Sequence, residues 1–209
     1  AAREVGGDYY DCFEIPENKL CLCFGDVAGK GVPAALIMSR LSGLVRSVLS
    51  FTDNVALATE RINDLLANFI PEDKFVTCIL GVLDSTQHTF RFVNCGHAEP
   101  LLRQMDGIVT PVCSNHPAFA LGMFPGLTYS ETCIHLNRGE TILLRTDGVE
   151  EGTSSDNQQF GIDRMLQLLS DSGGEPETVC HQLLRAVKTF MPPDKQSDDI
   201  AIVAFRRNF

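Results

Sequence analysis

The chain has 209 residues and a formal net charge of −10, and 44% of its residues are hydrophobic and 21% charged. This length and balance predict one globular domain, residues 1–209, with a substantial core. The acidic charge argues against nucleic acid as a partner, because phosphate backbones require clustered Lys and Arg. No apolar run approaches the roughly 20 residues of a membrane span, which argues against direct membrane insertion.

The first predicted elements are two strands, residues 9–15 and 20–25, joined by the turn-forming sequence PENK into a tight antiparallel hairpin. A helix is expected next, at residues 33–51, with Pro33 in its first turn. Asp53 is a candidate cap for a second helix, VALATERINDLLANFI.

The rest of the chain continues this alternation of paired strands and helices. Strands are predicted in FVTCILGVLD, TFRFVNCGH, TYSETCIHLN and TILLRTDG, the last two as a pair around RGE, and helices in DRMLQLLSD and ETVCHQLLRAVKTF before a buried strand, IAIVAF. Strands in hairpin-linked pairs with helices in blocks favour mainly antiparallel sheets covered by helices over a doubly wound parallel sheet.

The eight cysteines are better explained by packing than by bonding. Five of them lie among aliphatic and aromatic residues on strand-like segments, and no CxxC pair occurs: Cys21, Cys23, Cys78, Cys95 and Cys133. Buried free thiols are typical of a reducing compartment, so a cytoplasmic protein is expected.

Carboxylates stand at the ends of four predicted strand segments. With a hairpin turn at residues 16–19, the numbers of two paired residues add up to about 34 or 35. Asp8 is then placed across from Asp26 or Val27. Asp147 ends one strand of the second half, and the pair Asp198-Asp199 begins another. If these two strands are antiparallel neighbours, their carboxylates meet at the same sheet end.

Gathered carboxylates repel one another, so a cation is expected to accompany them. Oxygen ligands without a histidine pair or CxxC spacing favour Mg²⁺ or Mn²⁺ over Zn²⁺. A single aspartate at a strand end is more often a turn former. Four such segments together indicate a metal site.

Six motifs occur in the order and approximate spacing of one protein family: EVGGDYYDCFEI, FGDVAGKGVPAALIM, NCGHAEPLL, LLRTDGVEE, the pair Phe160-Gly161, and SDDIAIVAF. Over nearly its whole length the chain resembles the SpoIIE-type branch of the metal-dependent protein phosphatases (PPM). The resemblance implies an α+β fold, an αββα sandwich of two mainly antiparallel sheets flanked by helices. It also implies a site for two metal ions, Mn²⁺ or Mg²⁺, at one end of the sheets.

The resemblance assigns a role to each aspartate of these motifs. Asp26 would bridge both ions, and the carbonyl of Val27 would contact the second. Asp147 and Asp198 would complete the protein ligands of the first ion, which makes Asp26, Asp147 and Asp198 the catalytic set. Asp8 would hold an ion or its water shell, and the role of Asp199, an adjacent candidate ligand, stays open. Ions about 3.5 to 4 Å apart activate a bridging water for in-line attack on phosphorus.

The chain departs from the wider superfamily at two places. Ala28 stands where many members carry a histidine that can protonate the leaving group, so turnover is slow or water supplies the proton. No N-terminal arginine is clearly positioned to hold the substrate phosphate, and Arg3 is the remaining candidate. His97 has two interpretations, a contact with substrate or a strand-end histidine that satisfies backbone groups.

The function implied is that of a protein serine/threonine phosphatase acting on a phosphorylated regulatory protein, by resemblance a STAS-type anti-sigma factor antagonist. The alternative is a weakly active or inactive module that keeps the fold and binds a signalling partner. The chain begins almost on its first motif, so it is expected to be an output domain excised from a longer chain with an N-terminal regulatory region. Because the 33–51 helix directly follows Asp26, homodimerisation or an upstream segment is expected to control the site through this helix. The alternative is that the helix is only part of the core and has no role in control.

Overall fold

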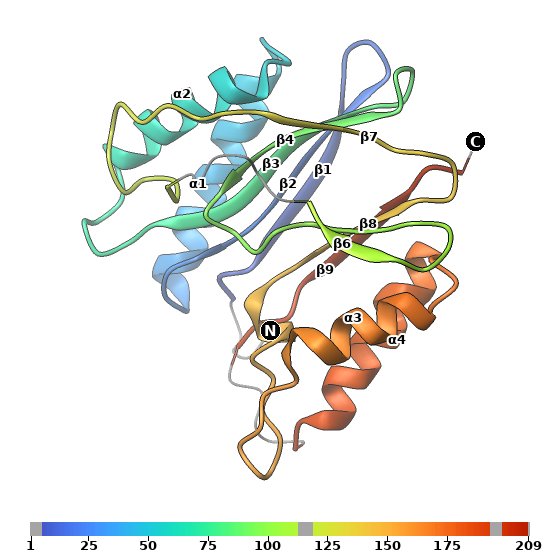
Figure 1. Ribbon diagram of the computed structural model, residues 1–209. Helices are drawn as coiled ribbons and strands as arrows, with labels where there is room; N and C mark the ends of the chain where they lie inside the picture. Colours follow the sequence, from blue (N-terminus) through green and yellow to red (C-terminus); the bar gives the residue numbers. More distant parts are fainter. Residues whose placement is uncertain (1–5, 113–118, 193–197, 209) are drawn as a thin grey trace. The chain divides into compact units, whose positions relative to one another are not determined.

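The computed structural model describes residues 6–112, 119–192 and 198–208, and the chain forms two compact units. The first unit holds a five-stranded sheet in the order β1-β2-β3-β4-β7 together with helices α1 and α2 (Figure 1). Its elements are β1 Tyr9–Ile15, β2 Lys19–Val27, α1 Val32–Leu49, α2 Val55–Ala67, β3 Val76–Asp84, β4 Thr89–Cys95 and β7 Thr132–His135.

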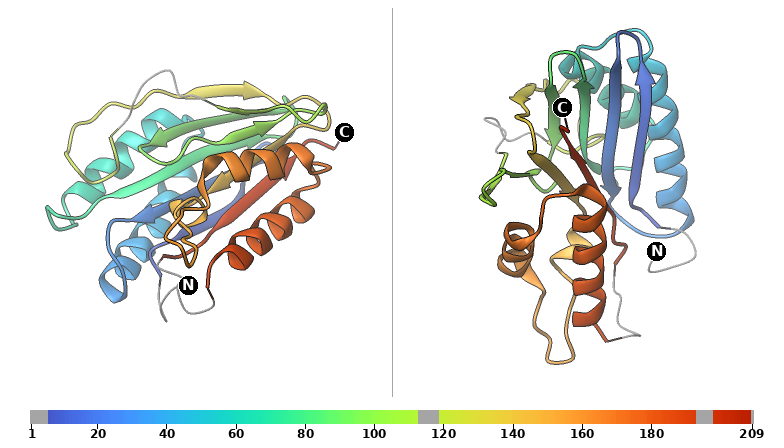
Figure 2. Two further views of the ribbon diagram at one scale, coloured as in Figure 1. Left: turned by 60° about the horizontal axis from the view of Figure 1, so that its bottom comes forward. Right: turned by 90° about the vertical axis from the view of Figure 1, so that its right-hand side faces the viewer.

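The second unit holds a four-stranded sheet in the order β6-β5-β8-β9 together with helices α3 and α4. Its elements are β5 Leu101–Arg103, β6 Val109–Pro111, β8 Thr141–Arg145, the 3₁₀ turn η1 Asp147–Val149, α3 Gly161–Asp171, α4 Pro176–Phe190 and β9 Ile202–Arg206. Figure 2 shows α3 and α4 side by side, and both contribute to the core of this unit.

The predicted fold class is confirmed: the chain is α+β, with two sheets whose strand pairs are antiparallel. The hairpin expected around RGE is wrong, because β7 pairs with β4 whereas β8 pairs with β5 and β9 in the other sheet. The short strands β5 and β6 were not predicted. Each has three residues, too few to show a periodic pattern.

The β1–β2 hairpin has the predicted position, with Ile15 opposite Lys19. Glu17 and Asn18 adopt positive φ angles of 66° and 57°, the left-handed conformation that such short turns require. The cap predicted for the next helix is wrong by one residue. Asn54 caps α2, since its side chain accepts a hydrogen bond from the backbone N–H of Leu57 at 2.9 Å.

Asp53 instead belongs to an ion-pair network. Its carboxylate lies 2.7 Å from the ammonium of Lys19 and 3.2 Å from the guanidinium of Arg91. The hydrogen bond from Lys19 lowers the pKa of Asp53. A charged partner on β2 and another on β4 therefore outcompete the helix end for this side chain.

The core of the first unit lies between its sheet and the two helices. Cys21, Cys23, Cys78 and Cys95 are fully buried there, as predicted, and burial raises the pKa of the Cys21 thiol. Cys133 is exposed, contrary to the prediction, because β7 is an edge strand whose residues alternate in burial. The seven cysteines within the described residues are all free thiols.

Helix α1 forms as predicted, with Pro33 in its first turn. Among the described helices it is the one whose length and hydropathy would suit a membrane span. Seven of its residues are buried in the core of its unit, which accounts for the apolar sequence. Leu36, in contrast, is 63% exposed and lies on the opposite side of the helix.

Candidate functional site

The first pair of predicted site residues is brought together by the β1–β2 hairpin. Tyr9 lies opposite Gly25, so the numbers of paired residues add up to 34. Continuing this register by one residue places Asp8 opposite Asp26, the first of the two predicted alternatives. A Cβ atom on Gly7 would lie 2.8 Å from Oδ1 of Asp26 and 3.3 Å from the carbonyl oxygen of Val27. Glycine therefore permits the close approach of the chain segment that carries Asp8.

The alternation of β2 separates Asp26 from the helices. Cys21, Cys23 and Val27 pack in the core with α1 and α2, so Asp26 is on the opposite face of the sheet. Both Asp8 and Asp26 are half-buried, whereas Val27 is buried. Two carboxylates, with a backbone carbonyl next to one of them, thus stand at one strand end.

Thr77 and His97 lie beside this strand end. Thr77 is the β3 residue opposite Asp26, and its hydroxyl is 3.1 Å from Nδ1 of His97. The backbone N–H of His97 donates to Oδ1 of Asn94 at 2.8 Å, and the amide of Asn94 donates back to the carbonyl of His97 at 2.9 Å. The side chain of Asn94 thus closes this strand end through the backbone of His97, and the imidazole of His97 contacts a hydroxyl group. A contact of His97 with substrate stays a prediction.

A cation from another segment, which the sequence did not reveal, lies against the turn after Val27. Ala28 donates its N–H to the carbonyl of Phe75 at 2.9 Å, so the β2–β3 register continues and Lys74 comes opposite Gly29. A Cβ atom on Gly29, whose φ is 119°, would lie 3.1 Å from Nζ of Lys74. In the sequence Lys74 ends a polar loop, PEDK, and is indistinguishable from a solvated surface lysine.

The second group of carboxylates lies in the other unit, at the end of the β8–β9 ladder. Thr146 donates its N–H to the carbonyl of Ala201 at 3.1 Å, and η1 begins at the next residue, Asp147. A Cβ atom on Gly148 would lie only 2.0 Å from the backbone oxygen of Asp199. The prediction that Asp147 and the Asp198-Asp199 pair share one sheet end is confirmed.

Two contacts hold these segments in place. The N–H of Asp199 donates to Oδ1 of Asp198 at 2.9 Å, and Asp199 itself is buried. On the other segment, the buried guanidinium of Arg145 donates to Oε1 of Glu150 from Nε at 3.0 Å and from Nη2 at 2.6 Å, and Nη1 donates to the carbonyl of Glu99. The turn that carries Asp147 is therefore closed by an ion pair across it.

Three of the predicted ligands belong to the first unit, Asp8, Asp26 and Val27, and three belong to the second, Asp147, Asp198 and Asp199. Within the described residues, no three His, Cys, Asp or Glu side chains form a group that could hold a metal ion. All six candidates offer oxygen donors, which suit a hard divalent cation. Arg3 lies outside the described residues.

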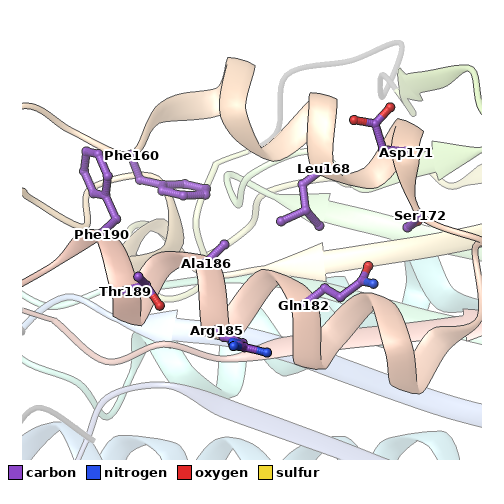
Figure 3. A pocket seen from close by; sticks show the side chains of 9 residues that line it. All are labelled: Phe160, Leu168, Asp171, Ser172, Gln182, Arg185, Ala186, Thr189 and Phe190. Atoms are coloured by element: carbon purple, nitrogen blue, oxygen red, sulfur yellow. The ribbon is translucent and has the colours of Figure 1, made fainter.

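A separate cavity of about 720 Å³ lies between α3 and α4 and contains none of the predicted site residues (Figure 3). Phe160 and Phe190 stand edge to face at one end of it, with their ring centroids 5.5 Å apart, and Asp171 lies toward the other end. Gly161, with a φ of 77°, begins α3 immediately after Phe160. Helix initiation and packing account for the Phe160-Gly161 motif.

Comparison with known proteins identifies relatives over the whole chain. Residues 16–208 match the family model described as Stage II sporulation protein E (SpoIIE). The chain is 26% identical to protein IcfG of Synechocystis sp. over 99% of its own length, and 27% identical to phosphoserine phosphatase RsbU of Bacillus subtilis over 72%. It spans only 37% and 44% of the lengths of these two relatives.

Solved structures share the fold. The PP2C phosphatase domain of the cell fate determinant SpoIIE from B. subtilis superposes with a TM-score of 0.81 at 19% identity, covering 98% of this chain and 59% of that one. The SiaA-PP2C domain of Pseudomonas aeruginosa gives a TM-score of 0.84 at 21% identity, covering 98% and 82%. The chain belongs to the SpoIIE family, and its fold is that of the PP2C-type (PPM) protein phosphatases.

Proposed function

We propose that this chain is a phosphatase domain that removes phosphate from phosphoserine or phosphothreonine of a regulatory protein, with two divalent cations, Mn²⁺ or Mg²⁺, as cofactors. The observation that carries the proposal is the placement of carboxylates at two strand ends, Asp8 opposite Asp26 and Asp147 beside the Asp198-Asp199 segment. The similarity to a phosphoserine phosphatase supports the reaction. A relative of the same fold, RsbX, has been solved in complex with magnesium, which supports the cofactor.

The protein supplies the oxygen ligands that would hold the two ions. Asp26 has two carboxylate oxygens and would serve both ions, with the carbonyl of Val27 beside it, while Asp147 and Asp198 would supply the remaining ligands and Asp8 or Asp199 the surrounding contacts. When bound, the two ions supply Lewis acidity and an activated water. Ala28 has no proton to donate, so the leaving serine oxygen takes its proton from solvent, and turnover is expected to be slow.

The test uses purified protein and three phosphorylated probes: p-nitrophenyl phosphate, a phosphoserine protein and a phosphotyrosine peptide. Phosphate release is expected with Mn²⁺, is expected to stop in excess chelator, and is expected to return when Mn²⁺ is restored. The phosphoserine protein should react faster than the phosphotyrosine peptide, because the metal site can reach a short side chain without a deep aromatic slot. Equal rates with and without chelator would refute the proposal, as would partner binding without any turnover, the behaviour of an inactive regulatory module.

Lys74 offers a further prediction about phosphate binding. The chain is acidic and its site residues are aspartates, so a fixed cation beside the proposed metal ions would add to the attraction of a phosphate dianion. The ammonium of Lys74 lies against the turn that follows Asp26 and Val27, and its ion pair with Asp73, at 3.1 Å, is a surface contact of little strength. We expect Lys74→Met to raise KM for p-nitrophenyl phosphate about tenfold, equivalent to about 1.4 kcal/mol.

The measurement is steady-state kinetics at saturating Mn²⁺, together with inhibition by inorganic phosphate, which should weaken in parallel. Lys74→Arg should restore most of the affinity because it keeps the charge. Lys188→Met, in the last turn of α4 in the other unit, is the matched control. An unchanged KM and unchanged phosphate inhibition in Lys74→Met would show that Lys74 is a solvated surface residue that does not contribute to phosphate binding.

The same proposal extends to the substrate, the location and the regulation of the phosphatase domain. We propose a STAS-type phosphoprotein as substrate, a cytoplasmic location, and residues 1–209 as a single phosphatase domain of a longer chain. The free thiols within the described residues agree with a reducing compartment. An upstream regulatory segment or homodimerisation would act through α1, which follows the Asp26 turn directly and leaves Leu36 exposed.

A further inference from the structure

An exposed aromatic patch lies on the segment that precedes β7. Phe119, Met123 and Phe124 are 55%, 41% and 54% exposed, and the rings of Phe119 and Phe124 stand edge to face with centroids 6.1 Å apart. These three residues are called the Phe119–Phe124 patch here. Large side chains that contact one another and remain open to solvent are typical of protein interaction surfaces.

The patch is held on a rigid support. The side chain of Asn63, which is fully buried on α2, donates to the carbonyl of Phe124 at 2.8 Å and accepts from the N–H of Gly122 at 2.9 Å. The N–H of Gly126 donates to Asp64 at 2.7 Å. The segment therefore runs along α2, as Figure 1 shows. A surface fixed in this way loses little conformational entropy when a partner binds.

Strand register places the patch near the Asp26 end of the same sheet. Val27 pairs with Val76, and Val76 pairs in turn with Leu121, which lies between Phe119 and Phe124 in the sequence. Two strand spacings of about 4.8 Å put Leu121 about 10 Å from Val27. A specific protein interface covers about 800 Å² on each partner, a disc of about 16 Å in radius. The Val27 end of the strands and Leu121 therefore lie within the span of one such interface.

We propose that the Phe119–Phe124 patch is the docking surface for the folded body of the phosphoprotein substrate, so that it selects protein substrates over small phosphate esters. This inference rests on the proposed phosphatase function. Exposed aromatic side chains are enriched in protein interfaces, and the phosphate itself carries little information about the protein to which it is attached. The patch accounts for how the domain would distinguish one phosphoserine protein from another when the site itself contacts only the phosphate.

The test compares three substrates: a folded STAS-type protein phosphorylated on serine, the phosphoserine peptide taken from it, and p-nitrophenyl phosphate. The wild type should prefer the folded protein to the peptide. The Phe119→Ser/Phe124→Ser double variant should lose about 30-fold in kcat/KM for the folded protein while both small substrates are unaffected. Phe51→Ser is the matched control, because Phe51 is 88% exposed and follows α1 near the β1–β2 turn, at the other end of β2 from Asp26.

Each other outcome overturns the inference. Equal losses for all three substrates would mean that the substitutions disturb the metal site or the fold. Phe124→Leu, which keeps an apolar side chain, should retain most of the activity toward the folded protein. No loss for the folded protein, or no preference for it in the wild type, would mean that the patch does not select substrate. Dimerisation that the double variant abolishes with unchanged kinetics would assign the patch to a second copy of the chain. A wild type inactive toward all three substrates would refute the proposed function and this inference together.

Discussion

The Asp26→Asn variant is expected to lose at least about 1000-fold in metal-dependent phosphatase activity, which corresponds to about 4 kcal/mol of transition-state stabilisation. Asp26 lies at the end of β2, opposite Asp8 and next to the Val27 carbonyl, and is the proposed ligand of both ions. An amide at this position removes the negative charge and half of the oxygen donors. Hydrolysis of p-nitrophenyl phosphate across a Mn²⁺ titration measures the loss.

A thermal melting experiment tests the assignment of Asp26 as a metal ligand without relying on turnover. Mn²⁺ should raise the Tm of the wild type, because a ligand that binds only the folded state stabilises it. The same ion should leave the Tm of Asp26→Asn unchanged. Without metal the variant should be at least as stable as the wild type, since the repulsion between Asp8 and Asp26 is gone.

Asp11 provides the matched control on the same hairpin. Its carboxylate accepts hydrogen bonds from Nε and Nη2 of Arg46 at 2.8 and 2.6 Å and thus faces α1 instead of the site. Asp11→Asn should cost at most about 1 kcal/mol of stability and leave the Mn²⁺ response intact. If Asp26→Asn retained the activity and Mn²⁺ response of Asp11→Asn, the assignment of Asp26 would be wrong.

Gly148→Ala is expected to have the second largest effect, about 100-fold in activity with a loss of about 1 to 3 kcal/mol in the free energy of unfolding. The added methyl group would lie 2.0 Å from the backbone oxygen of Asp199 and 3.1 Å from its carbonyl carbon. Both contacts are with backbone, which no rotamer change can relieve. The segments that carry Asp147 and Asp198 must therefore move apart, and their carboxylates move with them.

This variant isolates the spacing of the two segments, because Gly148 is in a 3₁₀ turn that alanine can adopt. Higher Mn²⁺ concentrations should recover part of the lost activity, as expected for weakened metal binding. Gly173→Ala, in the same unit with open space around its Cβ position, should behave as the wild type. Gly148→Ala with wild-type activity at limiting Mn²⁺ would show that the spacing has no bearing on the site.

The sequence was sufficient where a local signal determined a long-range pairing. The PENK turn set the β1–β2 register, and that register alone brought Asp8 opposite Asp26. The antiparallel pairing of β8 with β9 was the condition under which their aspartates would share one sheet end, and the structure meets this condition. Both inferences concern backbone pairing, in which one fixed turn or sheet end determines every neighbour.

The sequence was insufficient where the pairing of a strand or side chain depends on distant segments. A short polar turn between β7 and β8 predicts a hairpin, yet the two strands belong to different sheets. Asp53 has the composition of a helix cap, but Lys19 and Arg91 compete for its carboxylate. The positions of Lys74 and of the Phe119–Phe124 patch relative to Asp26 follow only from the β2–β3 register and the Val76–Leu121 bridge.

Anomalous diffraction at the manganese edge, from crystals of the wild type grown with Mn²⁺, tests the central claim most directly. The account predicts two manganese peaks about 3.5 to 4 Å apart, both bound by the carboxylate of Asp26 and one also bound by Asp147 and Asp198. No ordered manganese at these residues, or manganese bound only by aspartates of one unit, would contradict it.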